Sequence, residues 1–256
     1  MDSVTGDSPR RLARIAGVLY LINIVGGAFA IGFVPATLLS PDLAVTAHNI
    51  QTHMLLYRSG LVAHLLVTVT NVPMAVLFFE LFKVVNRRLA MLDVCLTLVA
   101  TAIEAAGVLN EFAPLVLLGS GPYGSAVPVA PLRALAHLPG DLSTIDYDIH
   151  TVFYGFDFLC VAYLVFTSTF LPRAIGVLLA IDGVAYLAHS FTDLLVPGFA
   201  AHLTPWIELP PIVSEGSLCL WLIVVGVNVQ RWKQRAAWRL GDLRPPDQPQ
   251  AIAALD

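Results

Sequence analysis

The chain has 256 residues, of which 57% are apolar and 12% carry charge, with a formal net charge of −4. Average soluble domains carry roughly 25% charged residues, and the mean hydropathy here is +0.77. This composition excludes a soluble globular domain, a disordered chain, a disulfide scaffold and a nucleic-acid binder, because a soluble domain of this length cannot bury so much apolar surface. It predicts a polytopic membrane protein.

Six apolar stretches are each long enough to cross a membrane as a helix. A hydrocarbon core of ~30 Å takes ~20 helical residues, and no stretch alternates with the period of two that membrane β-strands show. We therefore predict an all-α integral membrane bundle of six transmembrane helices. The predicted spans are residues 15–34, 57–82, 89–118, 151–171, 174–196 and 212–229.

The Lys and Arg residues predict the orientation of this bundle, because cytoplasmic loops carry an excess of both. With a cytoplasmic N-terminus, only Arg58 and Arg133 of the 14 Lys and Arg residues fall on the outer side. Both termini are therefore expected in the cytoplasm. The predicted organisation is a cytoplasmic segment (1–14), a single membrane domain (15–230) and a cytoplasmic end (231–256). That end is expected to be a basic, interfacial helix end followed by a disordered tail.

The predicted connections are short on the inner side and long on the outer side, where residues 35–56, 119–150 and 197–211 lie. Long connections often carry function. Ser40 is expected to cap a short amphipathic helix on the outer surface. The segment 119–150, rich in Gly and Pro, is expected to form an irregular loop with one short helix around residues 132–137.

Ionisable side chains predict a polar interior in the outer half of the bundle. Each costs ~2.5–3.5 kcal/mol inside a bilayer, so such residues usually face other polar groups. In the fifth span four polar residues recur at helical spacing and form one stripe. Together with groups on other spans they are expected to line an outward-facing cavity. The candidates are His64, Glu104, Glu111, Asp157, Asp182, Tyr186, His189, Asp193 and Glu215.

The inner half of the bundle has few acidic residues. Only Asp93 and Glu80 lie there, and both are expected near the cytoplasmic interface, beside Lys83, Arg87 and Arg88. This asymmetry predicts a cavity closed below by apolar packing, and it argues against a continuous pore.

Three functions fit such a cavity. The leading interpretation is a binding or structural membrane protein, with a small molecule or lipid headgroup at the outer face. The first alternative is a metal-dependent intramembrane hydrolase acting on a lipid-like substrate, with His64, Asp157, His189 and Asp193 as candidate zinc ligands. The second is a proton-coupled small-molecule carrier, which needs a polar route past Glu104 towards Asp93.

Four segments resemble one family of bacterial membrane proteins, domain-of-unknown-function family 4386. They are RIAGVLYLI (14–22), YRSG (57–60), FLPRAIGVLL (170–179) and EGSLCLWL (215–222). The order and spacing of these segments carry the resemblance, which covers roughly residues 11–230. It implies a multi-pass protein of the bacterial cytoplasmic membrane and assigns no activity.

Overall fold

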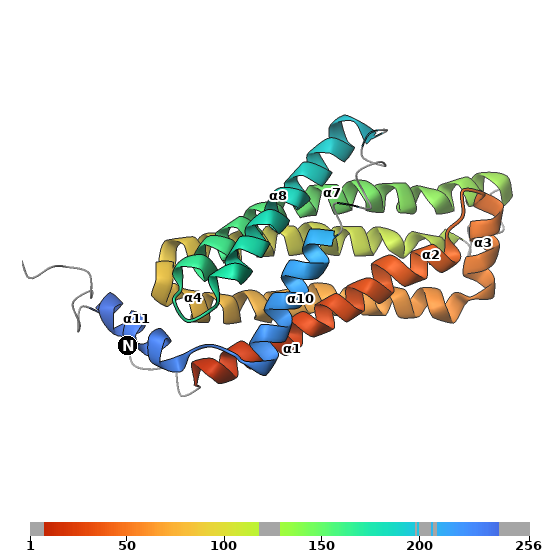
Figure 1. Ribbon diagram of the computed structural model, residues 1–256. Coiled ribbons are helices and arrows are strands. Elements are labelled where there is room, and N and C mark those ends of the chain that lie inside the picture. Colours follow the sequence, from red (N-terminus) through yellow and green to blue (C-terminus); the bar gives the residue numbers. More distant parts are fainter. Residues whose placement is uncertain (1–7, 118–128, 198, 200–205, 207–208, 241–256) are drawn as a thin grey trace, which may run out of the picture.

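The computed structural model describes residues 8–117, 129–197, 199, 206 and 209–240. Within them all regular secondary structure is helical, which confirms the predicted all-α class (Figure 1). Four helices, or five if one bent pair is counted as a single span, are long and apolar enough to cross a membrane.

The N-terminal part forms one long apolar rod. Helix α1 (Pro9–Gly27) continues through the π-helix η1 (Ala28–Phe33) into the short helix α2 (Val34–Leu38). Pro9 stands in the first turn of α1, where its missing N–H leaves no hydrogen bond unmade.

Helix α3 (Leu43–Thr52) crosses the end of the bundle where α2 stops (Figure 1). The prediction that Ser40 caps this helix is wrong. The cap is Asp42, whose Oδ1 accepts hydrogen bonds from the backbone N–H groups of Ala44 (2.7 Å) and Val45 (3.3 Å). A carboxylate directly before the first turn satisfies two free N–H groups and faces the positive end of the helix dipole.

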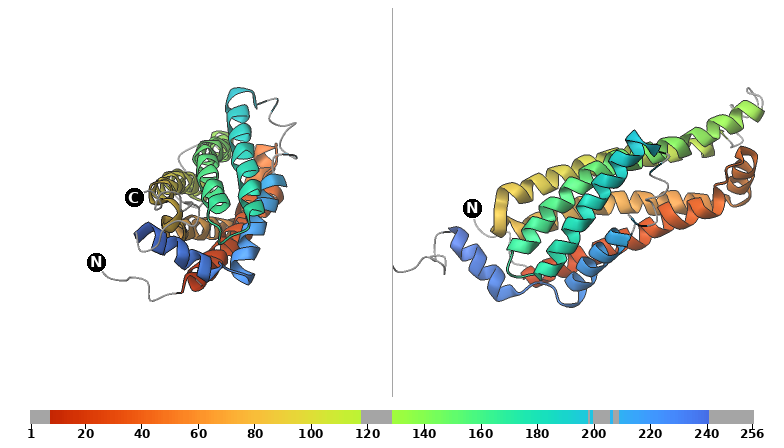
Figure 2. Two further views of the ribbon diagram at one scale, coloured as in Figure 1. Left: turned by 60° about the vertical axis from the view of Figure 1, so that its left-hand side comes forward. Right: turned by 45° about the horizontal axis from the view of Figure 1, so that its top comes forward.

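Helix α4 (Met54–Glu111) spans 58 residues but reverses at Asn86, where φ is −148° and ψ is 102°. A straight helix of that length would extend ~87 Å, about three times the thickness of a bilayer core. The side-chain oxygen of Asn86 accepts hydrogen bonds from the N–H groups of Arg88 (3.1 Å) and Leu89 (3.2 Å) and so caps a new helical segment. The two arms, 54–85 and 87–111, run antiparallel (Figure 2).

Helices α5 (Ala113–Leu117) and α7 (Val129–Thr167) follow. The predicted short helix around residues 132–137 is part of α7, but the irregular loop predicted for the rest of 129–150 is wrong, because these residues are helical too. Residues 119–128 lie outside the described residues. Helix α7 packs against α3, α4 and α5 along its length. These tertiary contacts outweigh the weak helix propensity of the Gly and Pro residues in this segment.

Helix α8 (Arg173–Leu195) lies unusually close to α7. A Cβ atom added to Gly176 would lie 2.8 Å from the backbone nitrogen of Phe166 and 2.9 Å from the carbonyl oxygen of Ala162. A Cβ atom added to Gly183 would likewise lie 2.7 Å from the carbonyl oxygen of Gly155. Glycine allows the two backbones to approach, as small residues do at many membrane helix interfaces.

The last two helices, α10 (Leu209–Val224) and α11 (Val229–Leu240), meet at an angle of 98°. Gly226, with φ of +73°, lies in the bend between them. The basic residues from 231 onward were expected to extend the last span, whereas in the structure they belong to a separate helix that begins at Val229.

Helix α11 is attached to the bundle by its long polar side chains. The indole N–H of Trp232 donates to the carbonyl of Leu81 (2.9 Å), and Arg239 donates to that of Val85 (2.8 Å). Arg235 donates to the carbonyl of Thr167, at the end of α7 (3.1 Å). These bonds satisfy carbonyls at the end of the first arm of α4 and of α7.

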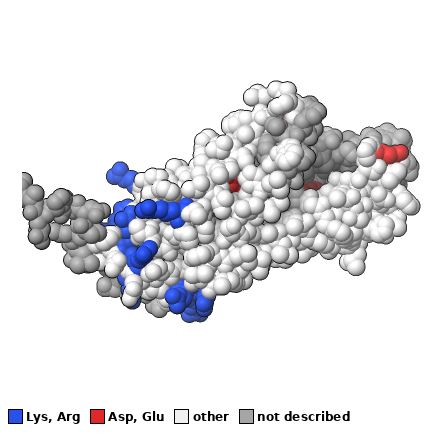
Figure 3. Space-filling view, viewed as in Figure 1, with Lys and Arg blue, Asp and Glu red and all other residues white. Residues whose placement is uncertain are grey.

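The helices form a closed ring in which α1, the two arms of α4, α7, α8 and α10 each contact the next, and α10 contacts α1 (Figure 2). The apolar core lies toward the end that carries α11, because Trp232 and Ala236 pack on it. On the face drawn in Figure 3 the Lys and Arg side chains gather at this same end. We call it the basic end and the opposite one the α3 end.

Candidate functional site

The hairpin of α4 places one histidine between two carboxylates near the α3 end. The Nδ1 atom of His64 lies 3.1 Å from Oε2 of Glu111, and its Nε2 atom lies 3.4 Å from Oε1 of Glu104. Glu104 and Glu111 are seven residues apart, so both project from one face of the second arm. A protonated imidazole here forms ion pairs with both carboxylates.

Glu104 is connected further into the bundle through Asn71. The side-chain amide of Asn71 donates to Oε2 of Glu104 (3.1 Å) and to the hydroxyl of Tyr154 on α7 (2.7 Å). Asn71 and Glu104 are only 2% and 4% exposed. We call Glu111, His64, Glu104, Asn71 and Tyr154 the polar line.

Two aspartates lie at the inner end of the polar line. Asp157 follows Tyr154 by about one turn of α7 and accepts a hydrogen bond from Thr97 (3.1 Å). Asp93, one turn before Thr97, is 1% exposed and contacts the Asp157 carboxyl. We call Asp93 and Asp157 the carboxyl pair. Asp93 was expected beside the basic residues of the inner turn, and the structure adds that its side chain is buried and interacts with Asp157.

A second polar cluster connects α1, α8 and α10. Asp182 on α8 accepts a short hydrogen bond from Ser214 on α10. Glu215 on α10 accepts one from Tyr186 on α8 (2.8 Å) and interacts with Tyr20 of α1. These contacts hold α10 in the ring between α1 and α8.

A third cluster joins α7 and α8 near the α3 end. The Nδ1 atom of His189 lies 3.7 Å from Oδ1 of Asp148, and the Asp148 carboxyl also contacts Asp193. Thr151 and Ser190 share a hydrogen bond of 2.7 Å one turn further in. The stripe predicted on the fifth span is therefore divided between two clusters.

The nine predicted cavity residues thus fall into three groups. His64, Glu104 and Glu111 meet in the polar line, and Asp157 lies at its inner end. Asp182, Tyr186 and Glu215 meet in the second cluster, and His189 and Asp193 in the third. Each described ion pair that involves one of the nine residues joins a histidine to a carboxylate.

Sequence reasoning left several partners of these residues out of the candidate set. Asp93, Thr97, Thr101 and Glu104 are all buried, and their offsets of 0, 4, 8 and 11 place them on one helical face. That stripe is visible in the sequence and could have identified Asp93. Asp148 has no such signal, because it falls in the segment predicted as a loop.

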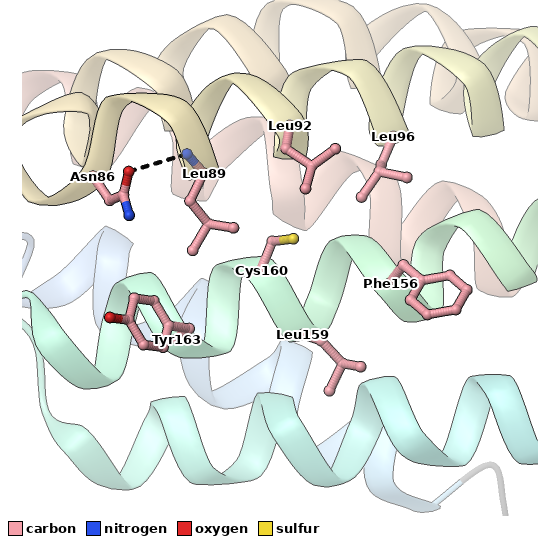
Figure 4. Close-up of a pocket in the computed structure, with 8 residues that line it drawn as sticks. All are labelled: Asn86, Leu89, Leu92, Leu96, Phe156, Leu159, Cys160 and Tyr163. Carbon is pink, nitrogen blue, oxygen red and sulfur yellow. Dashed lines mark hydrogen bonds between the residues drawn. The ribbon is translucent and has the colours of Figure 1, made fainter.

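Two surface grooves flank α7, and none of the nine predicted residues lines either. The first, of about 520 Å³, lies between the second arm of α4 and α7 (Figure 4). Its lining is mostly aliphatic and aromatic, with Cys160 pointing between the two helices (Figure 4). The second, of about 560 Å³, lies between α7 and α8 and is also apolar.

The described residues do not assemble a metal site. Nowhere among them do three or more His, Cys, Asp or Glu side chains converge so that they could hold an ion. The four candidate ligands lie apart: His64 in the polar line, Asp157 in the carboxyl pair, and His189 and Asp193 in the third cluster. A structural or catalytic zinc ion needs at least three protein ligands, so this donor arrangement does not fit zinc.

The fold and the clusters define a helical protein with apolar helices of membrane-spanning length and a polar interior. A family profile described as "Domain of unknown function (DUF4386)" matches residues 15–226. The chain belongs to this family, as its sequence motifs predict. No curated protein and no solved structure matches the chain.

Proposed function

We propose that this chain is a proton-coupled carrier of the bacterial cytoplasmic membrane, that Glu111, His64 and Glu104 begin its proton path, and that the Asn71 amide holds Glu104 and Tyr154 in position along it. The observation that supports this is the row of polar atoms from Glu111 to Tyr154, with successive atoms 2.7–3.4 Å apart. Hydrogen bonds join its members except at His64 Nε2 and Glu104, which are in ion-pair contact at 3.4 Å. An imidazole between two carboxylates can take a proton from one and release it to the other. Chains of acids and histidines serve as proton relays in many pumps and transporters.

The carboxyl pair supports the same function. A carrier needs a polar route that passes Glu104 and approaches Asp93, and the line ends at Tyr154, about one turn from Asp157 on α7. Below this point the described core is apolar. A carrier in this conformation is therefore closed at the basic end.

We further propose six spans with both termini in the cytoplasm. The reversal at Asn86 supports two spans within α4, and the near-perpendicular α11 fits a helix that lies along the membrane surface. The Lys and Arg side chains gather at the basic end (Figure 3). Because cytoplasmic segments carry an excess of Lys and Arg, this agrees with a cytoplasmic location of that end. The α3 end, with Glu111, then faces outward.

Binding of a small molecule or lipid headgroup in an outward-facing cavity is the second candidate. The observation that favours it is that small patches of Asp or Glu reach the surface in the middle of the face drawn in Figure 3, away from the basic end. Under this function the acids hold a ligand and no proton crosses the membrane.

Proton flux into proteoliposomes separates the two candidates. The purified chain is reconstituted, a pH gradient is imposed with the membrane potential clamped, and internal pH is followed with an entrapped dye. The carrier function predicts flux above that of protein-free liposomes, and a loss of most of it in Glu104→Gln.

The matched control is Glu80→Gln. Glu80 pairs with Lys83 at 2.5 Å near the inner turn and lies outside the polar line, so its variant should keep the wild-type flux. Wild-type flux no greater than that of empty liposomes overturns the carrier function and leaves ligand binding.

A further inference from the structure

The carboxyl pair has an unusual hydrogen-bond deficit. Asp93 is 1% exposed, yet neither of its carboxyl oxygens has a donor within the described part of the chain. Its neighbour Asp157, 8% exposed, accepts from Thr97. Two buried carboxylates in contact with no cation are strongly unfavourable.

Among the residues that the structure describes, no Lys, Arg or His is found to interact with the carboxyl pair. The titratable groups of the surrounding helices that feel the charge of the pair are Cys160 and Tyr154 of α7 and Tyr20 of α1. All three are neutral in their ordinary protonated forms. The missing donor must therefore be a proton on one of the two aspartates themselves.

We infer that Asp93 and Asp157 hold a single proton between their carboxyl groups and form a proton-binding site inside the membrane. One carboxyl is then the O–H donor and the other the acceptor, which satisfies one oxygen of Asp93 and leaves one negative charge on the pair. This inference deepens the proposed function and rests on it for the proton's role in transport. The location of the proton rests only on the contacts of the pair.

The groove of Figure 4 lies over the same two helices. Leu89 and Leu96 flank Asp93 by one turn on either side along α4, and Cys160 follows Asp157 by three residues on α7. The groove is open to the membrane and apolar, so a lipophilic reagent can approach the pair from the lipid. A water-soluble reagent has no comparable route through this apolar wall.

A lipophilic carbodiimide tests the inference. N,N′-Dicyclohexylcarbodiimide reacts with protonated carboxyl groups: the carboxyl oxygen bonds to the central carbon and the proton moves to a nitrogen. Acyl transfer to nitrogen then gives a stable N-acylurea that peptide mass spectrometry locates. At neutral pH we expect at most one label per chain, on Asp93 or on Asp157, because only one proton is present.

Asp157→Asn is the decisive variant. The asparagine amide can donate to Asp93 in place of the shared proton, so Asp93 becomes an unprotonated carboxylate and its labelling falls roughly tenfold or more. Glu80→Gln should label as the wild type does. Labelling of both aspartates in one chain, labelling of neither, or unchanged labelling of Asp93 in Asp157→Asn overturns the inference.

Thermal unfolding provides a second readout that does not depend on reagent access. If the folded state requires the proton, the unfolding temperature of the wild type falls as pH rises from mildly acidic to alkaline. In Asp157→Asn this fall should disappear, because the amide supplies its own N–H. Equal pH dependence in both proteins contradicts a shared proton even where the variant folds well. Failed proton flux with positive labelling would reject the carrier function alone.

Discussion

The interior of this bundle is apolar at one end and polar at the other. At the basic end the interior is apolar: the rings of Phe82 and Phe170 stack at 6.0 Å, and Phe78 meets Phe82 edge to face at the same centroid distance. Leu81 and Leu164 are completely buried beside them. Helix α11 packs on this core from outside.

Toward the α3 end the interior is polar. Helix–helix contacts there run through charged and hydrogen-bonding side chains, such as His64 with Glu111 and Thr151 with Ser190. Breaking one partner of such a buried pair leaves an unpaired polar group, whereas a truncated apolar side chain leaves only a cavity. The two ends should therefore respond differently to substitution.

The largest expected effect is at His64. In His64→Ala both Glu104 and Glu111 lose their imidazole partner, and loss of one member of a buried charge cluster costs about 3–5 kcal/mol of unfolding free energy. Chemical unfolding in detergent, followed by circular dichroism, measures this loss. His189→Ala is the control, because His189 lies 3.7 Å from Asp148 and contacts only one carboxylate at that distance. Equal losses in the two variants would contradict a special role for the His64 cluster.

A smaller loss is expected at the crossing of α7 and α8. The added Cβ of Gly176→Ala would lie under 3.0 Å from backbone atoms of α7, so the helices must separate. Overpacking of this kind typically costs about 1–3 kcal/mol. Gly216→Ala is the matched control, because nothing lies within 4 Å of its added Cβ. The same unfolding assay should show a clear loss for the first variant and little change for the second; the reverse order would refute the close approach.

The smallest effect concerns α11 at the basic end. Trp232→Phe keeps an aromatic ring but loses the hydrogen bond to the Leu81 carbonyl, which is worth about 1 kcal/mol. Trp221→Phe serves as the control, since the indole N–H of Trp221 has no hydrogen-bond partner within the described residues. Limited proteolysis near α11 should increase in the first variant only. Equal cleavage of both variants would mean that this hydrogen bond does not attach α11.

The helical class and most helix positions follow from the sequence because length and hydropathy determine them. The contacts of the site do not. His64 meets Glu111 and Asn71 meets Glu104 only because the chain reverses at Asn86, and the register of that hairpin is set by packing along both arms. The spacing of polar residues along a sequence shows which face of a helix they occupy, but it does not show which residue of another helix they contact.

Asp93 illustrates how sequence distance misleads. It lies within six residues of two arginines, which suggested a position beside them at the interface, yet its side chain is buried and interacts with Asp157. The expected loop over residues 129–150 failed for a related reason, because propensity is local and the packing of α7 on α3 and α5 is not.

The central claim is that the polar line is connected, and Asn71 is the residue that tests it most directly. Asn71→Leu removes no titratable group and keeps the number and branching of the side-chain heavy atoms, but it breaks the link between Glu104 and Tyr154. In the proteoliposome assay we predict that proton flux in Asn71→Leu falls to the level of Glu104→Gln while the variant stays folded. Wild-type flux in a folded Asn71→Leu protein would contradict a proton path through this line.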